Sequence, residues 1–310
     1  MVFEHKPVML KEVLEYLECR KNGVYIDGTL GRGGHTEAIL HELDNTGRLI
    51  AIDRDITAIE EVRKKLGDRP NLILVHDVFT NIPDILERTG YTEVDGMIFD
   101  LGVSSPQFDN PERGFSYNYN AALDMRMDQE QSLTAADIVN NYSLPELTRI
   151  IREYGEEKWA SRIALFIVKH RANKRIETTY DLVEIIKAAI PASARRSGGH
   201  PARRTFQALR IATNNELKLL EEMIGKVVPF LKKGGRICII SFHSLEDRIV
   251  KNKFRELARE CVCPPDFPVC VCDKKAELKI INTKPITASI EEINLNPRAR
   301  SAKLRVAEKR

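Results

Sequence analysis

The sequence lacks the features that mark several large classes of protein. No uninterrupted apolar run approaches the ~18 residues of a membrane span, and residues 1–13 carry acids and a proline where a secretory signal peptide has its apolar stretch. Cysteine is sparse, at six in 310 residues. A chain of this length buries roughly three quarters of its unfolded surface, so it needs neither disulfides nor metal merely to fold. We therefore expect a cytoplasmic globular protein with no membrane partner.

Neither sign of charge dominates, but charge is unevenly distributed along the chain. The formal net charge is +3. Residues 1–110 hold 12 Lys and Arg against 20 Asp and Glu, whereas residues 111–310 hold 36 against 25. A basic second half favours a surface that attracts a polyanion. The alternative is that the uneven distribution of charge has no functional role.

The order of predicted elements favours an α/β fold with an insertion. Short apolar runs alternate with helical patterns in the first hundred residues, as in the parallel βαβ units of a Rossmann-like, mostly parallel sheet. These runs lie at 23–27, 48–53, 71–76 and 94–100. Residues 132–190 then show helical signals alone, including a capping box from Ser143 to Glu146.

The α/β pattern resumes in the last third of the chain. A long helix is predicted over 205–231, and apolar strands follow at 236–242, 279–281 and 303–307. We therefore predict a discontinuous α/β domain over 1–110 and 211–310, interrupted by an all-helical domain over 111–210.

A glycine-rich loop over residues 27–35 joins the first predicted strand to its helix. Its glycines let the backbone approach a ligand without Cβ interference, and Asp53 ends the next strand, where an acid holds ribose hydroxyls. The third glycine of a dinucleotide fingerprint is replaced by Thr36, and no P-loop is present. Asp27 suits a cationic ligand such as a methionine sulfonium. The loop therefore indicates S-adenosyl-L-methionine, with glycines that only form turns as the alternative.

Several longer motifs are distinctive enough to identify a family. They lie at Asp100–Gln107, Arg113–Ser116, Leu123–Asp128, Tyr154–Glu157, Thr205–Ile211, Ser241–Arg248 and Asn296–Ser301. On these motifs, from about His5 to the C-terminus, the chain closely resembles the bacterial MraW-like family, ribosomal RNA small subunit methyltransferase H. The resemblance implies a class I S-adenosylmethionine-dependent methyltransferase fold with an inserted helical domain that serves substrate recognition.

The resemblance also implies a reaction and a set of cofactor-binding residues. The reaction is methylation of the exocyclic N4 of a cytosine in 16S rRNA, in the decoding region of the small ribosomal subunit. The alternatives are an amino-methyltransferase acting on another nucleic acid and a non-catalytic ribosome-assembly factor. The cofactor-binding residues carried over by the resemblance are Gly33, Gly34, His35, Asp53, Phe79, Asp100 and Gln107.

Two side chains are candidates for direct roles in catalysis. The N4 amino group of cytosine is a poor nucleophile, so an enzyme must orient it and accept a proton as methyl transfer proceeds. Asp100 ends the fourth predicted strand and His243 follows the fifth, at the sheet edge where ligands bind. A cofactor-holding role for Asp100 and a structural role for His243 are the alternatives.

Clusters of arginine are candidates for contact with the RNA backbone. Lys and Arg gathered in this way are what phosphate binding requires, although solvated surface charge is the alternative. The predicted RNA-binding residues are Arg195, Arg196, Arg203, Arg204, Arg298 and Arg300. The sequence does not indicate an oligomeric state.

Four of the six cysteines form two C-x-C pairs. They are Cys261, Cys263, Cys270 and Cys272. In a cytoplasmic chain such a cluster favours metal over disulfides. Four thiols are the right number for zinc, but the common knuckle is C-x-x-C. No metal site is assigned from the sequence, and none is carried over from the family.

Overall fold

The computed structural model describes residues 7–196, 199–264, 269 and 271–310, and these fold as two compact units. The first, an α/β unit, comprises residues up to Gly102 together with Leu217–Arg310. The second, a helical unit, is Val103–Glu216, which extends beyond 111–210 at both ends. Within the described residues no helix is both long and apolar enough to cross a membrane.

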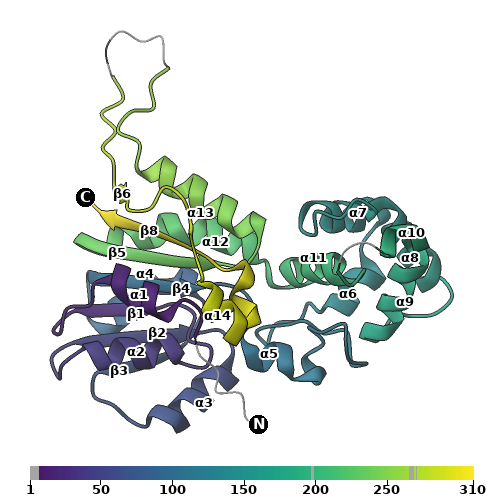
Figure 1. The fold of residues 1–310 in the computed structure, drawn as a ribbon, viewed down its shortest axis with the longest axis horizontal. Helices are drawn as coiled ribbons and strands as arrows, with labels where there is room; N and C mark the ends of the chain where they lie inside the picture. Colours follow the sequence, from purple (N-terminus) through teal and green to yellow (C-terminus); the bar gives the residue numbers. More distant parts are fainter. Residues whose placement is uncertain (1–6, 197–198, 265–268, 270) are drawn as a thin grey trace. The chain divides into compact units, whose positions relative to one another are not determined.

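The α/β unit is built on one mixed, mostly parallel sheet (Figure 1). Its strand order is β3-β2-β1-β4-β5-β8-β6, with β7 also pairing β8. Strands β1 to β5 run parallel, and β8 is antiparallel to its three neighbours. This arrangement confirms the predicted Rossmann-like fold class. The strands are β1 (Val24–Asp27), β2 (Arg48–Asp53), β3 (Leu72–His76), β4 (Val94–Asp100), β5 (Leu231–Ser241), β6 (Leu278–Ile280), β7 (Ile286–Thr287) and β8 (Lys303–Lys309).

Helices cover both faces of this sheet, which explains why its strands read as continuous apolar runs. Alternate residues enter opposite cores: Ile50 and Ile52 of β2 pack with α4, α12 and α13, whereas Leu49 and Ala51 pack with α1, α2 and α3. The helices of this unit are α1 (Leu10–Leu17), α2 (Gly34–Glu42), α3 (Ile56–Leu66), η1 (Phe79–Asn81), α4 (Ile82–Thr89), α12 (Glu216–Val227), η3 (Val228–Phe230), α13 (Ser244–Leu257), α14 (Ile290–Leu295) and η4 (Pro297–Ser301).

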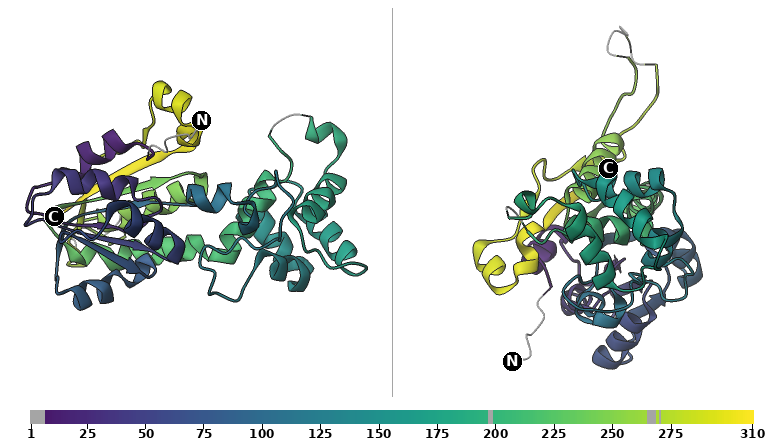
Figure 2. Two further views of the ribbon diagram at one scale, coloured as in Figure 1. Left: turned by 90° about the horizontal axis from the view of Figure 1, so that it is seen from below. Right: turned by 90° about the vertical axis from the view of Figure 1, so that its right-hand side faces the viewer.

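The helical unit consists of short helices and connecting loops (Figure 1 and Figure 2). It has its own apolar core. The predicted capping box is confirmed: Ser143 and Glu146 cap the first turn of α7 reciprocally. Leu182 and Ile186 of α9 are buried in this core. The helices are α5 (Ser105–Asp109), η2 (Pro111–Arg113), α6 (Ala135–Asn141), α7 (Leu144–Glu153), α8 (Ala160–Arg171), α9 (Thr179–Ala189), α10 (Ala192–Arg195) and α11 (Arg203–Asn214).

The prediction of one long helix over 205–231 is wrong. Asn215 adopts a left-handed conformation (φ 52°) that ends α11, and α12 begins at the next residue. Asparagine tolerates this conformation better than most residues, so the helix can break at Asn215 without any change in the spacing of the apolar residues. Strand β5 also begins at Leu231, five residues before the predicted 236, with Gly234 at φ 78° inside it.

Candidate active site

Three carboxylates end neighbouring parallel strands at one edge of the sheet. Asp27 is the last residue of β1, Asp53 of β2 and Asp100 of β4. The strand order reverses between β1 and β4, and ligands of open α/β sheets bind at the carboxyl ends of strands at such a point. Topology therefore gathers these acids at the expected location of a ligand site.

The glycine loop is held in place by Asp53. Its Oδ2 accepts the backbone N–H of Gly31 at 2.8 Å, and its Oδ1 accepts that of Asp55 at 2.9 Å. Gly33 is left-handed (φ 71°) at the N-cap of α2, and a Cβ there would lie 2.9 Å from Val62 Cγ2. A Cβ on Gly34 would lie 3.0 Å from Pro7. The close packing of this loop thus accounts for both glycines.

Asp27 is buried and hydrogen-bonded by the loop. Its Oδ2 accepts the hydroxyl of Thr36 at 2.7 Å and its Oδ1 the N–H of Thr29 at 3.1 Å, with 1% of the residue exposed. Burial raises the pKa of Asp27 to about 6, against these hydrogen bonds. Thr36, which breaks the dinucleotide fingerprint, therefore has a role of its own as a partner of Asp27.

The other two carboxylates are also perturbed toward the protonated form. Burial raises the pKa of Asp53 to about 6, and the pKa of Asp100 is raised well above its usual range by burial and by the negative charges of Asp27 and Glu246. Carboxylates whose ionisation is disfavoured by burial or by a neighbouring negative charge create a site that a cation would stabilise.

Asp100 has one oxygen with no hydrogen-bond partner. Its Oδ1 is buried and unpaired within the described structure, although 26% of the side chain is open to solvent. The backbone N–H of Asp100 donates to Thr29 Oγ1 at 2.6 Å, which fixes the end of β4 against the loop. A buried, unpaired carboxylate oxygen requires an explanation, and an absent ligand supplies one.

His35 contacts Asp100 from the start of α2. Its Nε2 lies 3.0 Å from the carbonyl oxygen of Val8, and its Nδ1 lies 3.9 Å from Asp100 Oδ2. Burial lowers the pKa of His35 to about 4, so the ring is neutral at physiological pH. Because the Val8 carbonyl can only accept, Nε2 carries the proton and Nδ1 presents a lone pair toward Asp100.

His243 is the N-cap of α13. Its Nδ1 accepts the backbone N–H of Glu246 at 3.4 Å, while Glu246 Oε2 accepts the N–H of Phe242 at 2.8 Å and that of His243 at 3.3 Å. Glu246 is 2% exposed and the sequence analysis missed it, although the spacing of a capping box was present. It adds a fourth acid to this edge of the sheet.

The second ring nitrogen of His243 lacks a well-aligned partner. Nε2 is 3.1 Å from Glu246 Oε1, but the geometry is too poor for a hydrogen bond, and the atom is buried. Since Nδ1 accepts from the helix, Nε2 carries the ring proton in the neutral tautomer. His243 is therefore arranged to donate a hydrogen bond rather than to accept a proton.

The remaining predicted cofactor residues lie in different units. Phe79 follows β3 in the α/β unit, is half-buried, and packs edge-on against Phe99 with ring centroids 6.1 Å apart. Gln107 belongs to the helical unit, where it is buried and its Oε1 accepts the N–H of Ser104 at 3.1 Å.

The predicted RNA-binding arginines are all exposed. Those of the helical unit flank the loop between α10 and α11, and those of the α/β unit lie in η4. Arg203 and Arg204 occupy the first turn of α11, which contains no acid. Cations are unfavourable at a helix N-terminus, so an anion bound there would be stabilised by both the arginines and the helix. The exposed arginines are Arg195, Arg196, Arg203, Arg204, Arg298 and Arg300.

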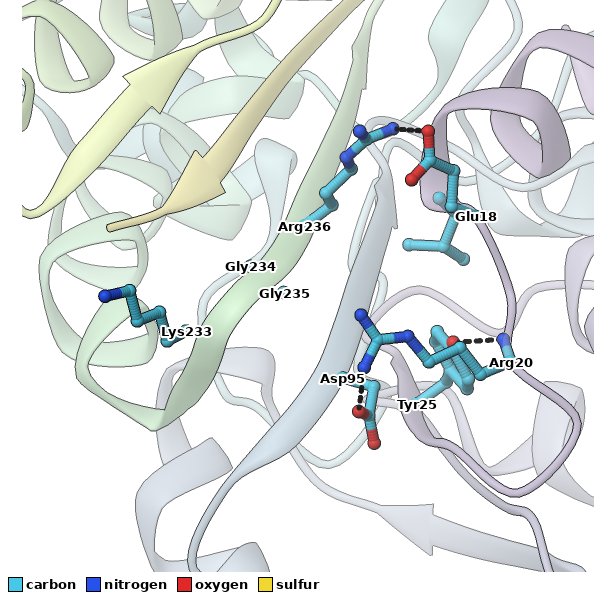
Figure 3. A pocket seen from close by; sticks show the side chains of 9 residues that line it. Glu18, Arg20, Tyr25, Asp95, Lys233, Gly234, Gly235 and Arg236 are labelled. Atoms are coloured by element: carbon cyan, nitrogen blue, oxygen red, sulfur yellow. Dashed lines mark hydrogen bonds and ion pairs between the residues drawn. The ribbon is translucent and has the colours of Figure 1, made fainter.

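A polar pocket of about 30 Å³ lies at the opposite edge of the sheet (Figure 3). It is lined by residues near the amino ends of β1 and β4 and by Gly234 and Gly235 of β5. Its side chains already pair, with Arg236 2.7 Å from Glu18 and Arg20 3.9 Å from Asp95. The pocket lies at the edge of the sheet away from the carboxylates, and its charged side chains are already paired, so it is not the candidate site.

Comparison with known proteins identifies the family. The model of the MraW methylase family matches residues 2–310. A Halothermothrix orenii protein named ribosomal RNA small subunit methyltransferase H is 67% identical over 99% of both chains. Proteins of the same name from Ruminiclostridium cellulolyticum and Clostridioides difficile are 52% and 53% identical over the full length of both chains. The chain therefore belongs to the MraW methylase family and is a methyltransferase that uses S-adenosylmethionine.

Proposed function

We propose that this protein methylates the exocyclic N4 of a cytosine in 16S rRNA, using S-adenosylmethionine. The observation that carries the proposal is the carboxylate edge formed by Asp27, Asp53 and Asp100. The names of the full-length relatives, which specify small-subunit ribosomal RNA, support the substrate class.

The carboxylate edge fits this cofactor better than a dinucleotide. S-adenosylmethionine carries a sulfonium and an α-ammonium, and when bound it supplies an electrophilic methyl group. Burial disfavours the charged form of these acids, so each would gain from a nearby positive charge. A pyrophosphate at the same place would meet negative charge on three sides. Asp27 and Asp100 therefore provide for the cation, and Asp53 for ribose hydroxyls.

Asp100 is the proton acceptor in this proposal. Its Oδ1 is unpaired and its pKa is raised, so its carboxylate is a stronger base than an ordinary aspartate. An acceptor with a pKa closer to neutral removes a proton from the N4 amino group more effectively. His243 Nε2–H would hydrogen-bond the pyrimidine and orient it. His35 presents a neutral ring to Asp100 and so adds no charge that would weaken this base.

The exposed arginines of the helical unit would hold the RNA backbone. A stacked pair, Tyr117 and His200 with ring centroids 4.4 Å apart, lies at the end of the loop between α10 and α11. Aromatic rings beside cations are typical of surfaces that bind unpaired nucleotides. An unpaired segment is also where a target base can be extruded at least cost.

The direct test is methylation in vitro. Small-subunit rRNA from cells that lack the gene is incubated with the protein and S-adenosylmethionine, and its nucleosides are identified by mass spectrometry. We expect N4-methylcytidine in 16S rRNA with wild-type protein and none with Asp100→Asn. A methyl group on another base or on DNA, or binding of both ligands without product, would refute the proposal.

A further inference from the structure

The connection from α13 to β6 projects from the α/β unit (Figure 1), and its described residues, 258–264, 269 and 271–277, form no helix or strand. Its base is closed where the N–H of Glu277 donates to the carbonyl of Leu257 at 2.8 Å. Structureless loops longer than ~12–15 residues are uncommon in compact domains. The described part of this connection, which runs from 258 to 277, therefore needs a source of order other than secondary structure.

Among the described residues of the segment, burial of large apolar side chains does not supply that order. Val262, Val269 and Val271 are 55%, 70% and 67% exposed, so these three side chains point into solvent. Small segments without a core are commonly held by disulfides or by a structural metal.

Three thiols of the segment converge. The Sγ atoms of Cys261, Cys263 and Cys272 all lie within 4.8 Å of one another, and those of Cys261 and Cys272 are 3.8 Å apart. A disulfide requires about 2.05 Å, so these two are not bonded. Zinc–sulfur bonds of about 2.3 Å in tetrahedral geometry place two sulfurs about 3.8 Å apart. The observed separation is that of two zinc ligands.

Backbone N–H groups point at each of these sulfurs. Val262 N–H donates to Cys272, Cys263 N–H to Cys261, and Val271 N–H to Cys263, each at 3.4 Å. Two of the three bonds link the first C-x-C pair to the second. Donors of this kind stabilise thiolate over thiol and orient metal ligands. They therefore compensate for a C-x-C spacing that is shorter than that of the common C-x-x-C zinc knuckle.

We propose that Cys261, Cys263 and Cys272 bind a structural zinc ion that staples the 258–277 segment. Thiolate sulfurs select zinc over magnesium or calcium, which prefer oxygen. One tetrahedral position is left for a further ligand, and Cys270 lies outside the described residues. The role is structural, because the site is separate in the fold from the carboxylate edge and shares no residue with it.

The test is metal content of the full-length protein purified anaerobically without added chelator. Inductively coupled plasma mass spectrometry is expected to find about one zinc per chain. The Cys261→Ser/Cys272→Ser variant should lose at least about nine tenths of it, because two ligands are removed. Cys19→Ser, at a half-buried cysteine after α1, is the matched control and should keep it. Circular dichroism and methyl transfer establish that each variant is folded.

A second readout does not depend on the variants. Removing zinc with a chelator should make wild-type protein more susceptible to trypsin at Arg259 and Lys275, and adding Zn²⁺ alone should restore resistance. Cobalt in place of zinc should give the visible absorption of a tetrahedral thiolate complex. Iron as the resident metal, equal zinc in the double serine variant, or a disulfide between Cys261 and Cys272 in the anaerobic protein would overturn the proposal.

Discussion

The imidazole of His243 caps α13 by accepting the backbone N–H of Glu246, at 3.4 Å. Histidine is an unusual N-cap, since serine, threonine, asparagine and aspartate fill this position far more often. The choice becomes understandable if the second ring nitrogen has a separate task. Nε2 is buried without a well-aligned partner at the carboxyl edge of the sheet, so capping and ligand contact are combined in one side chain.

This dual role can be separated by His243→Asn. Asparagine is a preferred N-cap, so the free energy of unfolding should change by less than about 1 kcal/mol. The donor at Nε2 is lost, and kcat should fall by roughly 10- to 100-fold, the cost of one substrate hydrogen bond. Urea unfolding and single-turnover methyl transfer measure the two effects. Full activity in a stable variant would reduce His243 to a helix cap.

Asp27 makes the free protein less stable as it ionises. Its folded-state pKa of about 6 lies above the ordinary 3.8, so the stability contributed by its proton is fully present below about pH 3.8. That contribution is lost as pH rises through about 6, and in total it amounts to about 3 kcal/mol. Asp27→Asn, which cannot ionise, should therefore gain stability relative to wild type between pH 4 and pH 6. Urea unfolding across this range measures the difference, and a difference independent of pH would contradict the assignment.

The carboxylate of Asp27 should also attract the positively charged sulfonium of the cofactor. Asp27→Asn should weaken S-adenosylmethionine more than S-adenosylhomocysteine, whose sulfur is neutral. Asp53→Asn should instead weaken both by a similar factor, about 10- to 100-fold, because the ribose is common to the two ligands. Isothermal titration calorimetry with the two ligands distinguishes these patterns. Asp68→Asn, at an exposed position of the same unit, is the control, and unchanged affinity in Asp53→Asn would remove the ribose assignment.

The sheet could be predicted from the sequence because its signals are local. Strand β2 was predicted with its observed bounds, and the alternation of strand and helix fixed the fold class. The break at Asn215 could not be predicted, since a single left-handed residue between two amphipathic helices changes neither periodicity nor composition.

The site was predictable by position but not by protonation state. Strand ends located Asp27, Asp53 and Asp100, whereas their raised pKa values arise mainly from burial and, for Asp100, also from the nearby charges of Asp27 and Glu246. Glu246 was missed for a different reason: its role depends on the backbone geometry of the turn before α13. The C-x-C spacing likewise left zinc open, and it is the convergence of the three sulfurs in space that supports the site.

The arginines beside α10 and α11 should contribute affinity for RNA through counterion release. Replacing all four with glutamine should lower RNA affinity and reduce the slope of log affinity against log salt by up to about 3, at roughly 0.7–0.9 per phosphate contact. S-adenosylmethionine affinity should not change, because the carboxylate edge lies in the α/β unit. The residues to be replaced are Arg195, Arg196, Arg203 and Arg204.

A control of equal charge removes the effect of net charge itself. It replaces with glutamine four exposed lysines of the α/β unit, Lys64, Lys65, Lys218 and Lys226. Fluorescence anisotropy with a small-subunit rRNA fragment, at a series of salt concentrations, gives both affinity and slope. If the two quadruple variants lose the same affinity and slope, binding follows overall charge and the loop is not an RNA contact. A larger loss confined to the arginine variant assigns phosphate binding to the helical unit, because equal charge was removed from both proteins.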